Sequence, residues 1–195
     1  MSCDTLSKNL LADYCAKAPV GGSKDALYLI NINDLDRTAS TISATNDQLI
    51  TAIVAQATKH GYKLTGKVYL GGGQADLVKG ANFDLYNHQL PFKILEDSVE
   101  ADKWADTLKN GRYVAILEKN VAAGNEANAF MVYGWDCGLE VTAYSSNIDD
   151  ADLKGVPSLT LGSNEKSYEP RPPRRYLSTD YTTTKAALEA LLPTP

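Results

Sequence analysis

The segment from Gly61 to Val68 is the part of this sequence closest to a known chemical motif. A phosphate-binding loop of the form Gly-x-x-x-x-Gly-Lys-Ser/Thr holds phosphates with its backbone amides and Mg²⁺ with its final hydroxyl. Here Val68 stands where that hydroxyl is required. The residues that follow continue a strand-like pattern, whereas a phosphate-binding loop opens a helix. The segment therefore predicts a turn between two strands and no nucleotide site.

Three consecutive glycines, Gly71, Gly72 and Gly73, follow this segment. The backbone amides of a glycine run can hold an anion, and such a run can also form a flexible break between strands. Both interpretations stay open from the sequence. In a protein that assembles with copies of itself, residues 71–80 are a candidate contact with a neighbouring subunit.

Side chains that bind metals or transfer protons are sparse. The two histidines, His60 and His88, have no Cys, Asp or Glu at metal-ligand spacing, so we predict no zinc site and no His-dependent triad, and place both in turns. Asp149, Asp150 and Asp152 lack the glycine and terminal Glu of a calcium loop, which indicates a solvated loop, with a weak cation or lysine-rich partner site as the alternative. The chain is predicted to need no cofactor and not to be an enzyme.

Residues 169–176 read Glu-Pro-Arg-Pro-Pro-Arg-Arg-Tyr. Prolines interrupt helices and sheet ladders, so we predict an extended segment close to polyproline II and outside the sheet core. Its arginines suit an aromatic-lined groove, a phosphate, or the carboxylates of a neighbouring subunit, and we favour an arm to a neighbour. The candidate interface residues are thus Gly71, Gly72, Gly73, Pro170, Arg171, Pro172, Pro173, Arg174, Arg175 and Tyr176.

Composition bounds the class of protein. The 195 residues are 44% hydrophobic and 22% charged, which is enough to build a core. A net charge of −5 opposes tight binding to a phosphate backbone, although an acidic conduit would let DNA slide through. Three widely spaced cysteines, Cys3, Cys15 and Cys137, indicate reduced thiols. We expect neither a signal peptide nor a membrane span, because no run of about 18 apolar residues occurs.

The elements that must position these residues are mostly short strands. Gly, Asn and Asp turns separate them, which indicates a mainly β (α+β) fold, an antiparallel sandwich or barrel. Residues 49–54 fit either a strand or a helix, with a slight local preference for helix. The other predicted strands cover residues 26–32, 62–70, 81–86, 113–118, 130–135, 139–144 and 156–161.

Two helices are predicted. One covers residues 98–110, with Asp97 and Glu100 as a capping pair and Trp104 on the side that packs onto a sheet. A short terminal helix opens at residues 182–184, and its apolar face comprises Ala187, Leu188, Leu191 and Leu192. We predict that the first helix flanks the sheets and that the second, short helix ends a C-terminal extension.

With these segments placed, the chain resembles the tail tube and related ring-forming virion structural proteins of tailed bacteriophages. The resemblance spans about residues 20–165. Its most suggestive part is Tyr-Gly-Trp at 133–135 followed by Gly-Leu-Glu-Val at 138–141 and Gly-x-x-x-Leu-Thr-Leu at 155–161. It implies an antiparallel β-sandwich or barrel and a strand at 49–54, which we adopt over the local preference for helix.

The resemblance also implies a function. Copies would form a ring, typically hexameric, and rings would stack into a tail tube or tail ring through which DNA passes. The protein would assemble in the host cytoplasm, reside in the virion tail, contact other tail or connector proteins, and bind no membrane. Residues 1–165 would form the tube-like domain and residues 166–195 a Pro/Arg-rich arm with the terminal helix. The loop that reaches an adjacent ring would lie at 34–48 or 71–80.

Two other functions stay open from the sequence. A soluble β-sandwich adaptor would bind a protein partner through its Pro/Arg-rich tail and would be a stable monomer. An enzyme would use carboxylates gathered at a loop cluster, and would need a deep pocket with convergent Asp or Glu side chains.

Overall fold

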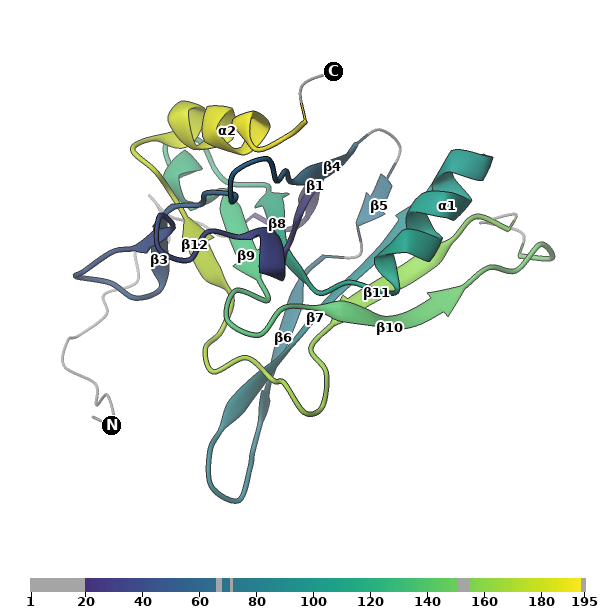
Figure 1. The fold of residues 1–195 in the computed structure, drawn as a ribbon, viewed down its shortest axis with the longest axis horizontal. Helices are drawn as coiled ribbons and strands as arrows, with labels where there is room; N and C mark the ends of the chain where they lie inside the picture. Colours follow the sequence, from purple (N-terminus) through teal and green to yellow (C-terminus); the bar gives the residue numbers. More distant parts are fainter. Residues whose placement is uncertain (1–19, 66–67, 71, 151–154, 194–195) are drawn as a thin grey trace.

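The computed structural model describes residues 20–65, 68–70, 72–150 and 155–193. These residues form two β-sheets and two α-helices, and the sheets are open and do not close into a barrel (Figure 1). The predicted mainly β sandwich with a flanking helix and a short C-terminal helix is therefore confirmed. Neither described helix is long and apolar enough to cross a membrane.

The larger sheet has seven strands in the order β2-β3-β12-β9-β8-β1-β4. Its pairs are antiparallel except for β12 and β3, which run parallel. The strands are β1 (Ser23–Asn31), β2 (Thr41–Ile42), β3 (Leu49–Ala52), β4 (Tyr62–Thr65), β8 (Tyr113–Lys119), β9 (Phe130–Tyr133) and β12 (Arg174–Tyr176).

The smaller sheet has the order β10-β11-β7-β5, and β6 pairs with the other half of the long strand β7. All its pairs are antiparallel. The strands are β5 (Val68–Leu70), β6 (Gln74–Val78), β7 (Leu85–Ile94), β10 (Glu140–Ser145) and β11 (Ser158–Gly162). The helices are α1 (Val99–Leu108) and α2 (Tyr181–Ala190), and two short 3-10 turns cover Ile32–Asp34 and Glu126–Asn128.

The larger sheet is buried on both faces. Along β1, Leu27 and Leu29 pack toward the smaller sheet and α1, while Tyr28 and Ile30 pack toward α2. Successive side chains of a strand point to opposite faces, so this alternation places one apolar core on each side. Double burial explains why the central strand β8 is a continuous apolar run.

Helix α1 packs one face onto a sheet, as predicted, and it also contacts the second sheet, but its cap differs by one residue. The Ser98 hydroxyl accepts the Ala101 N–H at 3.2 Å, the bond predicted for Asp97. The ring of Trp104 meets Phe92 edge-on, with centroids 6.3 Å apart. Val99 is 79% exposed, so the packed face comprises Ala101, Ala105 and Leu108 together with Trp104.

Helix α2 covers the outer face of the larger sheet, and the predicted terminal helix is confirmed. The Asp180 carboxylate caps it by accepting the Thr183 N–H at 2.7 Å. Leu188 is fully buried against the sheet. The ring of Tyr181 stacks on Phe130 with centroids 5.6 Å apart.

Polar contacts fix α2 to the strands beneath it. The Tyr181 hydroxyl donates to the buried Glu118 carboxylate at 2.6 Å, and Lys24 pairs with the same carboxylate. The Tyr28 hydroxyl donates to Glu189 at 2.7 Å. Burial and the Glu189 carboxylate raise the pKa of Tyr28, so the phenol keeps its proton and its donor role.

Two predictions about strands near the ends of the larger sheet have opposite outcomes. Residues 49–54 contain strand β3, so the choice of strand over helix is confirmed. The prediction that residues 169–176 lie outside the sheet core is wrong, because β12 lies between β3 and β9. The prolines of this segment all precede β12, and the three residues that pair keep their N–H groups. The sheet thus combines strands from the predicted segments 1–165 and 166–195.

The predicted strand at 81–86 is displaced. Residues 81–84 form the turn between β6 and β7, and β7 then continues through His88 and Pro91, where the sequence predicted an end. Pro91 fits because β6 pairs with β7 up to Gln89 and β5 pairs from Phe92 onward, so the proline lies opposite the interruption between β5 and β6.

Candidate functional site

The hairpin of β6 and β7 projects from the sandwich as a two-stranded ribbon (Figure 1). Its register runs from Gln74 opposite Gln89 to Val78 opposite Leu85. Near the tip, Leu77 is 50% and Phe83 is 68% exposed. An isolated two-stranded hairpin is marginally stable in water, and apolar side chains gathered on such a projection are typical of an interaction surface.

The glycine run forms the base of this hairpin. Gly72 and Gly73 lie just before β6, whose pairing with β7 begins at Gln74 opposite Gln89. A side chain at Gly73 would meet the ring of Tyr133, whose nearest atom lies 2.1 Å from the Cβ position. Gly72 has a positive φ of 81°, and Gly71 lies outside the described residues. The positive φ of Gly72 and the close packing at Gly73 thus account for two glycines of the predicted interface.

The Pro/Arg residues of the predicted arm make contacts within the chain. Arg171 pairs with Asp47, and Arg175 Nη1 donates to the Asn128 carbonyl at 3.1 Å. Arg174 is buried, with Nη1 3.0 Å from the Asp136 carboxylate, and Tyr176 lies in the core. Both edges of β12 are paired, so its three residues are not free to pair with a neighbouring subunit in this conformation. Of the prolines, Pro170 is exposed and Pro172 and Pro173 are half-buried.

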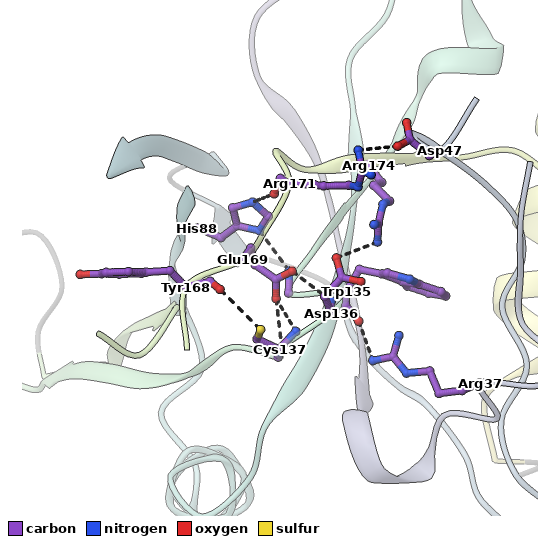
Figure 2. A network of polar contacts seen from close by, with 12 residues as sticks. Arg37, Asp47, His88, Trp135, Asp136, Cys137, Tyr168, Glu169, Arg171 and Arg174 are labelled. Carbon is purple, nitrogen blue, oxygen red and sulfur yellow. Dashed lines mark hydrogen bonds and ion pairs between the residues drawn. The ribbon is translucent and has the colours of Figure 1, made fainter. Parts of the chain in front are cut away.

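Glu169, which precedes this segment, is the centre of a buried polar network (Figure 2). Its carboxylate is 1% exposed and accepts three backbone N–H groups, from Asp136 at 3.0 Å, Cys137 at 2.8 Å and Gly138 at 3.2 Å. Burial raises the pKa of Glu169, and the three hydrogen bonds oppose that shift. The carboxylate therefore fixes the loop between β9 and β10, where the Tyr-Gly-Trp motif ends.

His88 joins the same loop to the Pro/Arg segment. It is 2% exposed and lies within β7, so the prediction of a turn is wrong. Its Nδ1 accepts the Gly134 N–H at 3.2 Å, which leaves Nε2 to donate to the Arg171 carbonyl at 3.0 Å. Burial lowers the pKa of His88 to about 4. A neutral imidazole with both nitrogens bonded is a structural crosslink.

Replacing Gly134 by alanine should destabilise the fold by more than the same change at Gly124. Both glycines have positive φ, 68° and 81°, and an alanine in this region costs about 1–2 kcal/mol. At Gly134 the added Cβ would also lie 2.9 Å from the Tyr113 carbonyl oxygen, whereas Gly124 has open space. We expect a further cost of about 1–3 kcal/mol from overpacking. Urea denaturation of both variants measures the difference, and equal costs would contradict the described packing.

A groove lies between α1 and the edge strand β4. Its volume is about 450 Å³, and the apolar side chains that line it include Leu29, Tyr62, Trp104 and Leu108. Two carboxylates also line it, of which Glu100 is exposed and Asp34 pairs with Lys59 at 3.2 Å. Neither is a buried carboxylate of the kind that enzymes activate. The groove therefore suits an apolar segment of a protein better than a reacting substrate.

The other chemical candidates lie apart from these features. Among the described residues no three His, Cys, Asp or Glu side chains are placed to hold a metal ion. His60 is exposed before β4, Asp149 is exposed after β10, and Asp152 lies outside the described ranges. Cys137 is a free thiol whose pKa is raised by burial, as expected for an unreactive cysteine.

Sequence reasoning missed the hairpin tip and Glu169. The tip had a local signal, because Lys-Gly-Ala-Asn at 79–82 has the composition of a turn. Glu169 had none, because its three N–H partners lie about thirty residues earlier in the chain. Comparison of the chain with protein-family models, with curated proteins and with solved structures finds no match.

Proposed function

We propose that this chain is a virion structural protein that assembles with copies of itself into rings, which stack as a phage tail tube or tail ring and form a conduit for DNA. The observation that carries the proposal is the projecting β6–β7 hairpin. Leu77 is 50% exposed and Phe83 is 68% exposed on it. A second protein surface that covers these side chains would stabilise the hairpin.

The sheet edges support self-assembly. Strand β4 ends the larger sheet and β10 ends the smaller one, and each pairs on one side only among the described strands. Edge strands offer unpaired N–H and C=O groups, through which sheets of neighbouring copies can join. A heterologous contact of this kind closes into a ring when its rotation permits.

The outer face of the smaller sheet supports a conduit. Gln89, Lys93, Ser158 and Thr160 alternate with core residues along β7 and β11 and so point away from the core. A ring that turned this face inward would offer mainly hydroxyl and amide groups, together with the ammonium group of Lys93, to passing DNA. Hydroxyl and amide groups hydrogen-bond to water and hold a phosphate backbone less tightly than a basic surface does.

An adaptor function through the Pro/Arg-rich tail has less support. Such a tail would have to leave the domain to enter a partner's groove. Arg174 and Tyr176 are instead buried in the larger sheet, and Arg171 pairs with Asp47. Homo-oligomeric assembly, with a hexamer as the expected ring and with other tail or connector proteins as partners, uses the surfaces that are exposed.

Self-assembly can be measured directly on the full-length protein. Multi-angle light scattering and negative-stain microscopy should reveal rings or tubes of the 21.1 kDa chain at high concentration. A Leu77→Asp/Phe83→Asp variant should remain monomeric with an unchanged unfolding midpoint, because both side chains are exposed. Ile148→Asp is the matched control, since Ile148 is 86% exposed on a different loop. A wild-type chain that stays monomeric at a concentration of about 1 mM would contradict the proposal.

A further inference from the structure

The groove beside α1 runs along the whole of β4. At one end it is lined by Tyr62, which is 53% exposed, and by Trp104. An adjoining hollow of about 250 Å³ continues past Leu64 to Thr65 and shares Trp104 and Glu100 with the first. An unpaired strand edge and an apolar groove therefore lie side by side, with a helix as the far wall.

This arrangement suits an added strand. Among the described strands β4 pairs only with β1, so its other edge keeps free backbone groups. An extended segment laid along such an edge gains main-chain hydrogen bonds, and its alternate side chains enter the adjoining groove. The occupant must therefore be extended, have a free edge of its own and carry exposed apolar side chains.

We infer that the β6–β7 hairpin of a second copy of this chain occupies the groove, with β6 added to the edge of β4. Strand β6 pairs on one side only among the described strands and has five residues against the four of β4. Leu77 and Phe83 supply the apolar side chains for the walls at Tyr62 and Trp104. Lys79 near the tip is exposed and pairs with Asp84 of the same hairpin at 2.6 Å, and its charge is opposite to that of Glu100 beside the groove.

The occupant belongs to another copy because of where the two surfaces lie. In Figure 1 the hairpin projects at the bottom of the molecule, and β4 lies at the top beside α1. Each copy then carries an inserting hairpin and a receiving groove at separate places. A copy can therefore bind one neighbour through its hairpin and another through its groove. The inference rests on the proposed self-assembly and names the two surfaces that join.

Cysteine crosslinking between full-length chains tests this contact. In a background with Cys3, Cys15 and Cys137 changed to Ser, one variant carries Phe83→Cys and a second carries Lys103→Cys, at an exposed residue that lines the groove. Mild oxidation of the mixture should give about tenfold more disulfide-linked dimer than a mixture of Phe83→Cys with Ile148→Cys, because a disulfide needs Cα atoms within about 7 Å.

The outcomes separate this inference from the proposed function. Specific crosslinking of Phe83→Cys to Lys103→Cys supports the hairpin-in-groove contact. Equal yields in both mixtures, from a protein that forms rings or tubes, overturn the contact and leave self-assembly standing. A chain that is monomeric by light scattering and gives no specific crosslink overturns both.

Discussion

Replacing Glu169 by alanine should lower the free energy of unfolding by about 3–5 kcal/mol, because three buried backbone N–H groups lose their acceptor. Solvent hardly reaches this site in the folded protein, since Glu169 is 1% exposed. Urea denaturation followed by tryptophan fluorescence reports the change, since Trp135 lies in the same loop.

Two further variants show whether the loss comes from these bonds. Glu169→Gln keeps an acceptor oxygen for Cys137 and Gly138 and should lose less than Glu169→Ala. Glu165→Ala removes an exposed carboxylate four residues earlier and should be nearly neutral. If Glu165→Ala costs as much as Glu169→Ala, the network does not hold the loop.

Stability should fall by about 3 kcal/mol as the pH drops from 6.5 to 4, and His88 should cause that loss. The pKa of His88 is lowered from its ordinary 6.5 to about 4 in the folded protein, so the unfolded chain binds the extra proton first. The stability that neutral His88 contributes is complete at a pH above its pKa in the unfolded chain. It is lost as the pH falls toward its pKa in the folded protein. Protonating Nδ1 would also break the bond from the Gly134 N–H.

The second histidine provides the matched control. Denaturation midpoints measured from pH 4 to pH 7 should flatten in His88→Gln and should keep their slope in His60→Gln, because His60 is exposed. The pKa of Glu169 is raised in the folded protein, so its protonation increases stability as the pH falls to just above 4.5, opposite to the effect of His88. The comparison of the two histidine variants is therefore best repeated in a Glu169→Gln background. An unchanged slope in His88→Gln would show that other groups carry the acid sensitivity.

Elements with a strong local pattern were predictable. Helix α1 has a capping residue and a regular apolar face. Residue spacing alone does not determine whether Asp97 or Ser98 is the cap. For residues 49–54 the local pattern slightly favoured a helix. Their pairing with β12 and β2 makes them a strand, and only the family resemblance indicated it.

Elements defined by distant partners were not predictable. Arg174 and Tyr176 follow three prolines, and nothing local indicates that β3 and β9 lie on either side of them. His88 reads as a turn residue close to Pro91, but it is buried within β7, which pairs with β6 and β5 from elsewhere in the chain. The two surfaces of the proposed contact have the same origin, because a groove beside α1 and a hairpin that leaves the sheet arise from long-range packing.

The position of β12 between β3 and β9 has a consequence for the order of events during synthesis. The seven-stranded sheet is incomplete until residues 174–176 have left the ribosome, and α2 can cover its outer face only later still. A nascent or prematurely terminated chain therefore lacks the strand that joins two parts of its own sheet. In the proposed self-assembly, this order would favour complete chains over fragments as building blocks.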